Sequence, residues 1–322
     1  VRLHHEAGGL TGNVFAFRDS LRQVVEEFAS QGSGPYGLRN NGVLEGSEKV
    51  EVLVRDRLQP SRILSVRALV RLVDYTFEPF SGRILLTSFL PAVDENLNPL
   101  SLRVTYEVDQ GGDPFWVLGA DGQWRVNDTL EIGGSLVKDK NALAPYDLTS
   151  ANATLRLGPK TALVVEGAQS TSTVNTNPTN QSSSTALAGR TGEVSGKAAR
   201  VELAHEGDTT DARIFWGKSS TLFNNLAAPL NGGREELFAR GGIKLTPELK
   251  LYGEASQSED RNAGGGERTG AGVGLRWAAS ERLTLDGSLR TARERIGTQG
   301  NGVLTWPYDQ TLGLSSSIGS GS

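Results

Sequence analysis

The stretch Leu237–Gln257, LFARGGIKLTPELKLYGEASQ, consists of two short runs that meet at Thr246-Pro247. Between positions 237 and 245, the odd-numbered residues are apolar or glycine, whereas the even-numbered residues are Phe, Arg, Gly and Lys. Side chains of a β-strand point alternately to its two faces, so each run predicts a strand with one apolar face. The turn residues between the runs predict an antiparallel hairpin.

The same pattern recurs along the chain, in pairs of runs joined by tight turns. The predicted hairpins are Phe115–Val137, Ala151–Ser170, Ala198–Ser219, Glu236–Gln257 and Gly270–Ala292. Long polar segments separate them: Lys138–Ser150, Thr171–Lys197, Ser220–Glu235, Ser258–Thr269 and Arg293–Asp309. Short turns at one end of the strands and long loops at the other are typical of a transmembrane β-barrel. Thr311–Ser322 predicts a further strand, and we expect more strands beyond it, because bacterial single-chain barrels have even strand counts.

The two faces of the predicted strands differ in charge. In a closed barrel, the charged positions would face the lumen: Arg240, Lys244, Lys250, Glu254, Arg276, Asp286 and Arg290. The apolar positions would face lipid: Leu249, Leu251, Val273, Leu275, Leu283 and Leu285. A soluble sheet with one packed face gives the same alternation. The long connections and the charges in mid-strand favour the barrel over a soluble β-sandwich.

Residues 1–110 show a different pattern and predict a small soluble β-sandwich-like domain ahead of the barrel of residues 111–322. Strand-like runs occupy Lys49–Arg55, Ile63–Val73, Arg83–Thr87 and Ser101–Val108. Arg18–Phe28 fits a short amphipathic helix or the continuation of a strand. The Gly/Pro-containing stretch Gln110–Pro114 is the predicted boundary between the two parts.

Part of this region is similar to a module of large, mostly uncharacterised outer-membrane proteins of Gram-negative bacteria, in which it precedes a β-barrel. The similar residues are Gly34–Tyr36, Glu45–Arg57, Asp74-Tyr75, Gly82–Leu85, Asp94–Pro99 and Arg103–Val108. The resemblance implies an envelope location and a two-part architecture. It implies no chemistry that transfers to residues of this chain.

Composition narrows the classes of function. The net charge is -4, so the chain lacks the excess of basic residues that is expected of a nucleic-acid-binding protein. The absence of cysteine excludes disulfides and thiolate metal sites. No run approaches the roughly 18 apolar residues of a membrane helix, but a barrel strand needs only about 9–11 residues with alternate ones apolar.

Candidate chemical sites are few. The histidines His4, His5 and His205 lack the spacing of a metal site, and the stretch Asp94–Asn98 predicts a side-chain-stabilised turn rather than a calcium loop. Gly270, Gly272 and Gly274 alternate within a strand, unlike a dinucleotide-binding loop. The carboxylates Glu26-Glu27, Asp56 and Glu259-Asp260 have no catalytic partner in sequence, and Arg55-Asp56-Arg57 predicts a cross-strand row of ion pairs. We therefore expect no catalytic residues, no cofactor and no enzyme activity.

The sequence thus predicts an outer-membrane β-barrel that acts as a channel or envelope scaffold. Its expected partners are outer-membrane lipid and other envelope proteins, but not nucleic acid. Aromatic residues near strand ends fit the interfacial girdles of such barrels. We further expect the long-loop rim to face outside, and residues 1–108 to lie at the opposite, periplasmic rim. The alternative is a soluble or surface-displayed β-sandwich that serves as an adhesin or assembly subunit.

Overall fold

The computed structural model describes residues 1–40, 42–57, 59, 61–109, 112–174, 191–226, 232–262, 265–280, 283–296 and 306–319. Within these ranges the regular structure is β-strand, and all strands pair in antiparallel sheets. Among the same residues there is no helix long and apolar enough to span a membrane. The fold is therefore all-β, as the alternating sequence pattern predicts.

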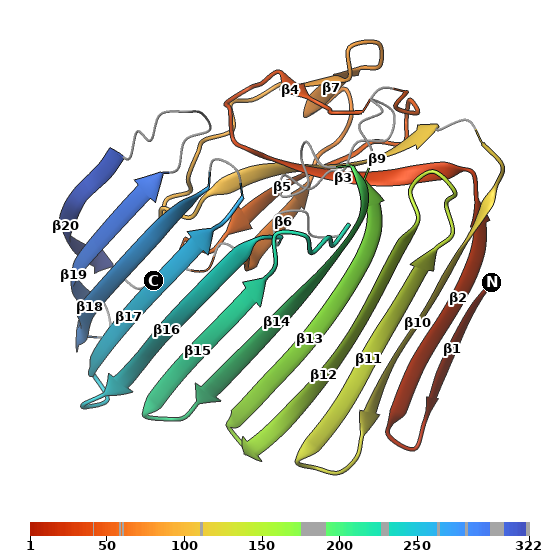
Figure 1. Cartoon of the computed structure of the whole chain (residues 1–322). Coiled ribbons are helices and arrows are strands. Elements are labelled where there is room, and N and C mark those ends of the chain that lie inside the picture. The colour runs from red at the N-terminus through yellow and green to blue at the C-terminus, as the bar shows by residue number, and fades with distance from the viewer. Residues whose placement is uncertain are drawn as a thin grey trace.

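The largest sheet has thirteen strands in the order β1-β2-β10-β11-β12-β13-β14-β15-β16-β17-β18-β19-β20 (Figure 1). Its described strands are β1 (Arg2–Ala7), β2 (Leu10–Asp19), β10 (Phe115–Arg125), β11 (Leu130–Asp139), β12 (Tyr146–Gly158), β13 (Thr161–Val174), β14 (Gly192–Glu206), β15 (Thr210–Ser219), β16 (Arg234–Lys244), β17 (Leu249–Asp260), β18 (Gly266–Ser280), β19 (Leu283–Ile296) and β20 (Trp306–Gly319). From β10 onward each strand pairs with its neighbours in sequence, which confirms the five predicted hairpins. The strand predicted at Thr311–Ser322 begins earlier, at Trp306.

The described sheet is a curved, open wall whose edge strands are β1 and β20 (Figure 1). The prediction of antiparallel strands is confirmed, whereas closure into a barrel is not part of the observed pairing. Of the predicted loop Thr171–Lys197, both ends belong to β13 and β14. Its centre, residues 175–190, lies outside the described residues.

The N-terminal residues differ from the prediction. Strands β1 and β2 belong to the large sheet, where Asp19 at the end of β2 lies opposite Phe115 at the start of β10. Residues 2–19 are therefore not part of a separate domain. Of the two alternatives predicted for Arg18–Phe28, the strand is confirmed and the helix is wrong, because the segment contains the end of β2 and most of strand β3 (Leu21–Ala29). Residues 21–109 form an inserted domain between two neighbouring strands of the sheet.

The inserted domain contains two small sheets that pack over one core. One sheet has the order β3-β9-β5-β6, with β9 (Leu100–Asp109), β5 (Lys49–Arg55) and β6 (Ile63–Ala68). The other has the order β4-β8-β7, with β4 (Tyr36–Gly37), β8 (Arg83–Leu86) and β7 (Tyr75–Glu78). Buried side chains from both sheets, together with Leu90 from the connection after β8, form the core: Val24, Tyr36, Val50, Val52, Tyr75, Phe77, Ile84, Leu86, Leu90, Leu102, Val104, Tyr106 and Val108.

The inserted domain lies at the same rim of the large sheet as the long connections (Figure 1). Strand β2 ends at this rim and β10 starts from it. In the same way, β11 ends and β12 starts at this rim, on either side of the connection 140–145. The tight turns form the opposite rim. The expectation that residues 1–108 lie opposite the long loops is therefore wrong, because an insertion between β2 and β10 must leave and re-enter at one strand end.

The two faces of the large sheet have different neighbours. The inserted domain contacts the concave face through Glu236 and Glu254, and register partners of these residues share that face. The opposite, outward face carries large apolar side chains that are more than a third exposed: Val14, Trp116, Trp124, Leu136, Ile214, Leu237, Ile243, Leu251, Val273, Leu275, Trp277, Leu285 and Leu289. This distribution inverts the usual arrangement of a water-soluble sheet.

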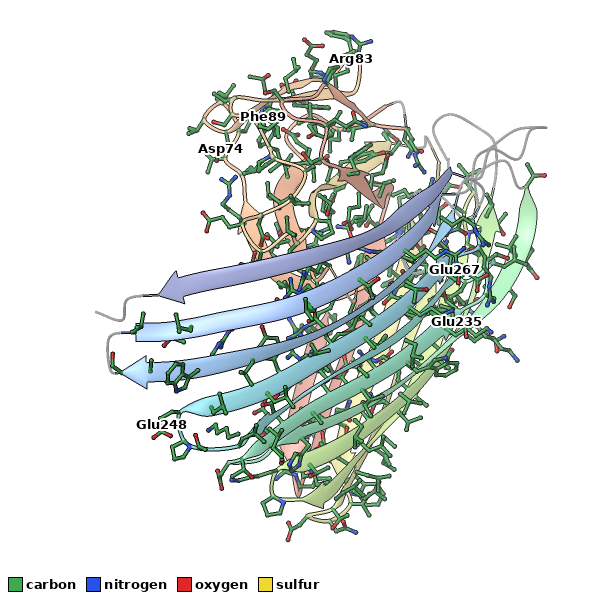
Figure 2. All side chains as sticks on the ribbon, turned by 90° about the vertical axis from the view of Figure 1, so that its left-hand side faces the viewer. Asp74, Arg83, Phe89, Glu235, Glu248 and Glu267 are labelled. Atoms are coloured by element: carbon green, nitrogen blue, oxygen red, sulfur yellow. The ribbon has the colours of Figure 1, made fainter. Side chains whose placement is uncertain are left out.

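Charge on the outward face is confined to one edge. On β10–β19 the outward charged residues all lie near the ends that join the long connections: Lys138, Asp147, Glu193, Lys197, Lys218, Glu235, Glu259, Glu267, Arg293 and Arg295. Figure 2 shows Glu235 and Glu267 at this edge, and Glu248 in a tight turn at the other rim. The described outward surface between the rims consists of apolar, small or uncharged residues.

Tryptophans mark both edges of this uncharged band. Trp116 and Trp216 lie toward the long connections, and Trp124 and Trp277 lie toward the tight turns, all on the outward face. Other aromatic residues from the predicted girdle, including Phe215 and Phe238, are buried on the concave face instead. The outward set alone therefore has the arrangement expected of an interfacial girdle.

A buried polar group joins two strands of the inserted domain. Glu26 of β3 accepts hydrogen bonds from the Tyr106 hydroxyl and, at 3.0 Å, from the backbone N–H of Arg39. The Asn40 amide donates to the Tyr106 oxygen at 3.0 Å. Burial raises the pKa of the Glu26 carboxyl, against the opposing effect of the Tyr106 hydrogen bond. Protonation of Glu26 therefore favours the folded domain.

Glu26→Gln is expected to stabilise the inserted domain at neutral pH. Because the folded pKa of Glu26 is raised, its protonation stabilises the native state at low pH, and this contribution is lost as the pH rises through the folded pKa. The difference in unfolding free energy between the variant and the wild type should grow as the pH increases above about 4.5. Denaturant titrations over this range measure it, and the exposed Glu95→Gln serves as control. A difference that is constant or shrinks with pH would contradict the assignment.

Candidate functional site

The candidate site lies where a loop of the inserted domain meets the concave face of the large sheet. Arg57, just after β5, donates from Nη2 to the Glu254 Oε1 of β17 at 3.0 Å. Four residues later, the Ser61 hydroxyl donates to Glu236 of β16. Two polar contacts thus connect segments that are more than 170 residues apart in sequence.

Arg55 holds this loop from within the domain. Its guanidinium binds both carboxylate oxygens of Glu27, at 2.6 Å each, and a further nitrogen donates to the Ser61 carbonyl at 3.3 Å. Ser101 on the intervening strand β9 also donates to Glu27. The side chains of Glu27 and Arg55 are 1% and 8% exposed, so the pair is shielded from water. It therefore fixes the start of the loop that carries Arg57 and Ser61.

Glu254 is shared between cations of the domain and of the sheet. Besides Arg57, it lies 3.3 Å from Arg290 Nε of β19, and its register partner on β16 is Arg240. Burial lowers the pKa of Arg57, and Glu254 opposes that shift. Two guanidinium groups, those of Arg57 and Arg290, thus share one carboxylate at this contact, and Arg240 lies on the adjacent strand.

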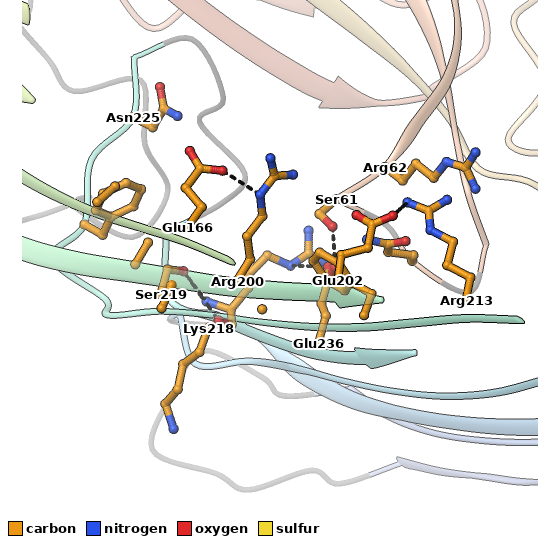
Figure 3. A pocket seen from close by; sticks show the side chains of 18 residues that line it. Ser61, Arg62, Glu166, Arg200, Glu202, Arg213, Lys218, Ser219, Asn225 and Glu236 are labelled. Atoms are coloured by element: carbon orange, nitrogen blue, oxygen red, sulfur yellow. Dashed lines mark hydrogen bonds and ion pairs between the residues drawn. The ribbon is translucent and has the colours of Figure 1, made fainter. Parts of the chain in front are cut away.

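A cavity of about 410 Å³ lies beside these contacts, between the loop and strands β13–β16 (Figure 3). Ser61 and Arg62 line it from the domain, and Phe215 and Phe223 form apolar parts of its wall. On the sheet, Arg200 pairs with Glu166 at 2.6 Å and Arg213 pairs with Glu202 at 2.7 Å. Lys218 points away from the cavity in Figure 3 and pairs with Glu235 on the outward face. The cavity is therefore lined by both signs of charge.

The connection after β15 covers part of the same face. Phe223 is buried, and the Tyr146 hydroxyl donates to the Asn224 carbonyl at 3.1 Å. The Asn224 N–H in turn donates to Ser170 Oγ at 2.8 Å. The described part of this long connection therefore folds over the concave face rather than away from it.

All seven charged residues predicted to face a lumen lie on the concave face. Lys250 pairs with Asp211, Arg276 pairs with Asp286 at 2.8 Å, and Arg290 contacts Glu254. Among the described residues, Arg240 and Lys244 have no carboxylate within ion-pair distance. The structure thus brings Arg240, Glu254 and Arg290 to the domain contact, whereas the Lys250 and Arg276 pairs lie within the sheet.

Sequence reasoning missed the residues that the inserted domain contributes. The string Arg55-Asp56-Arg57 predicts a cross-strand ion-pair row, but its members have three different partners: Glu27 for Arg55, Arg62 for Asp56 and Glu254 for Arg57. Arg57 and Arg62 follow the end of β5, where strand alternation no longer applies. No local signal in the sequence could identify their partners on β14–β17.

The other sequence candidates have structural roles. His205 lies between Thr161 and Thr210 hydroxyls at 2.8 and 3.0 Å. Asp94 accepts from the backbone N–H groups of Asn96 and Asn98 at 2.8 Å, which confirms the side-chain-stabilised turn. These hydrogen bonds, foremost those of Asn98, lower the pKa of Asp94. The described residues contain no group of three or more potential metal-ligating side chains.

The glycines of β18 make room on the concave face. A Cβ atom at Gly274 would clash with the Tyr252 ring, and one at Gly272 would approach Arg290 Cγ at 3.0 Å. The absence of side chains there lets Tyr252 and Arg290 lie across β18.

Comparison with known proteins gives no further assignment, since no protein-family model and no curated protein matches the chain.

Proposed function

We propose that the large sheet is the wall of an outer-membrane β-barrel, and that the protein is an envelope channel obstructed by its own inserted domain. One observation carries this proposal. The outward face is apolar and uncharged between the rims, while the charged face meets the inserted domain. In a membrane barrel the apolar face contacts lipid and the polar face encloses water.

The size of the apolar surface supports a membrane environment. A typical soluble monomer exposes apolar patches of at most about 300–600 Å², whereas here exposed Leu, Ile, Val and Trp side chains extend from β2 to β19. All strands from β10 to β19 have 10–15 residues. A tilted strand that crosses a bilayer needs about 9–11. The outward tryptophans at both edges agree with this depth.

The same observation disfavours the β-sandwich alternative. A sandwich buries the apolar face of each sheet against the other. Here the domain packs on the charged face instead, through Arg57 and Ser61. The resemblance of residues 34–112 to a module of outer-membrane proteins also supports an envelope location.

The inserted domain and the long connections lie at the same rim of the sheet, so they face the same side of the proposed membrane. Outer-membrane barrels have short periplasmic turns and longer extracellular loops. In this orientation, the inserted domain enters the barrel from outside. A periplasmic domain would require the long connections to be periplasmic too.

Single cysteines can test both membrane insertion and obstruction, because the chain has no native cysteine. Exposed positions suit labelling at the long-connection rim (Ala142→Cys), at the tight-turn rim (Asp128→Cys) and on the concave face near the tight turns (Lys244→Cys). A small, membrane-impermeant thiol reagent is added to intact cells and, separately, after permeabilisation of the outer membrane.

We expect intact cells to show labelling at position 142 only, and permeabilised cells to show labelling at all three positions. Labelling at position 244 in intact cells would contradict obstruction by the domain. Labelling at position 128 but not at 142 in intact cells would reverse the orientation. A protein that leaves the envelope fraction without detergent would refute the membrane barrel itself.

A further inference from the structure

An arginine of the inserted domain meets an arginine pair of the sheet at one end of the cavity. Arg62 of the domain and Arg213 of β15 both line this end (Figure 3). Arg213 and Arg240 are themselves direct register partners on β15 and β16. Like charges directly opposite each other in a sheet are destabilising. Arg62, Arg213 and, on the next strand, Arg240 therefore place three positive charges where two parts of the fold meet.

The neighbouring carboxylates neutralise this cluster incompletely. Glu202 pairs with Arg213 at 2.7 Å, and Asp56 lies 3.8 Å from Arg62. Among the described residues, Arg240 has no carboxylate within 4.0 Å, and its register partner Glu254 binds Arg57 and Arg290. Arg213 also has a buried Nε without a hydrogen-bond partner. A buried, unsatisfied donor on a charged group is costly unless a ligand completes it.

The electrostatic environment of Arg62 agrees with an unneutralised site. Burial lowers the pKa of Arg62, and the charges of Arg213 and Arg240 lower it further. Asp56 and Glu202 oppose this shift only in part. An anion placed among the three guanidinium groups would remove the repulsion.

The cavity next to the cluster provides space for such an anion. Its volume of about 410 Å³ falls within the range of small-molecule sites. Figure 3 shows Arg62 and Arg213 at one end of it, with Glu202 beside them. The planar guanidinium group presents paired donors that match the geometry of phosphate oxygens. The remainder is lined by two ion pairs, Glu166 with Arg200 and Glu236 with Arg234, so the positive charges there already have carboxylate partners.

We propose that Arg62, Arg213 and Arg240 form a binding site for a phosphate or sulfate group, which bridges the inserted domain to the sheet. The site goes beyond the proposed channel function and does not depend on a membrane location, because it rests only on the contact between domain and sheet. The anionic group is either a free ion or part of a larger polar solute that extends toward Ser61 and Glu236.

Calorimetric titration of the full chain in detergent, with inorganic phosphate at constant ionic strength, tests the site. We expect saturable binding that weakens at least tenfold in Arg62→Gln and in Arg240→Gln. Arg276→Gln, on the same face but paired with Asp286, should bind like the wild type. A parallel titration with a sugar phosphate distinguishes the two kinds of ligand. If the site takes a larger solute, the sugar phosphate should bind more tightly than inorganic phosphate. If the site takes the free ion, inorganic phosphate should bind as tightly as the sugar phosphate or more tightly. Absence of phosphate binding, or equal weakening in Arg276→Gln, would overturn the proposal.

Thermal melting separates a binding role from a structural one. Without phosphate, Arg240→Gln should melt no lower than the wild type, because the substitution removes a repulsive charge. Phosphate should raise the melting temperature of the wild type and not that of the variant. A lower melting temperature of Arg240→Gln in the absence of phosphate would show that Arg240 stabilises the fold itself, and would overturn the site.

Discussion

Val273→Arg is expected, in the proposed membrane barrel, to destabilise the protein by about 2–4 kcal/mol. Val273 lies on the outward face of β18, midway between the tight turn and the long connection, with Gly253 and Leu289 as register partners on the adjacent strands. The Val273 and Leu289 side chains are 57% and 49% exposed. In a bilayer this row contacts lipid, so an arginine there would have to remain in hydrocarbon or distort the membrane. Reversible unfolding from lipid vesicles in denaturant measures the effect.

Thr269→Arg is the matched control for Val273→Arg. Thr269 lies on the same face of the same strand, four residues closer to the long connections and next to the outward charges Glu267 and Arg293. An arginine near the interface should cost only about 0–1 kcal/mol. Equal costs at the two positions would show that depth does not matter, and the outward face would then not lie in a membrane.

Arg55→Ala is expected to destabilise the inserted domain by about 3–5 kcal/mol. The substitution removes both guanidinium contacts to Glu27 and leaves a nearly fully buried carboxylate without a cation. It also removes the donor to the Ser61 carbonyl, so the loop that contacts Glu236 loses its support. All five tryptophans lie outside residues 21–109. Amide hydrogen exchange in β3, β5 and β9 is therefore the suitable measurement.

Two controls distinguish a lost ion pair from a general effect of the substitution. Arg67→Ala changes an exposed arginine on the edge strand β6 and should cost no more than about 0.5 kcal/mol. The double variant Glu27→Leu/Arg55→Met replaces the buried pair with apolar groups and should recover most of the stability. If the double variant is as unstable as Arg55→Ala, the unpaired Glu27 charge is not the cause.

Local sequence patterns predict the strands of the large sheet well. The alternation in Leu237–Gln257 predicts β16, β17 and the turn at Thr246-Pro247 within a few residues. It also assigns Arg240 and Lys250 to one face and Leu251 to the other, as observed. These properties depend on neighbours in the chain, because alternation and turn geometry are set within about ten residues.

Residues 1–19 show where local patterns were insufficient. Strand β1 pairs with β2, and β2 pairs with β10, which follows it in sequence only after the whole inserted domain. Nothing within β2 distinguishes a strand of the inserted domain from a strand of the large sheet. The position of the domain at the long-connection rim follows from this pairing and was equally inaccessible to sequence reasoning.

The sequence by itself determined that this protein is all-β, that its strands from Phe115 onward form antiparallel hairpins, and which residues share a face. Only the tertiary structure decided which face is covered, because coverage depends on the contacts of Arg57 with Glu254 and of Ser61 with Glu236. The same long-range contacts place Arg62 at the cavity that Arg213 lines. Alternation is encoded locally, whereas the environment of each face arises from segments that meet only after folding.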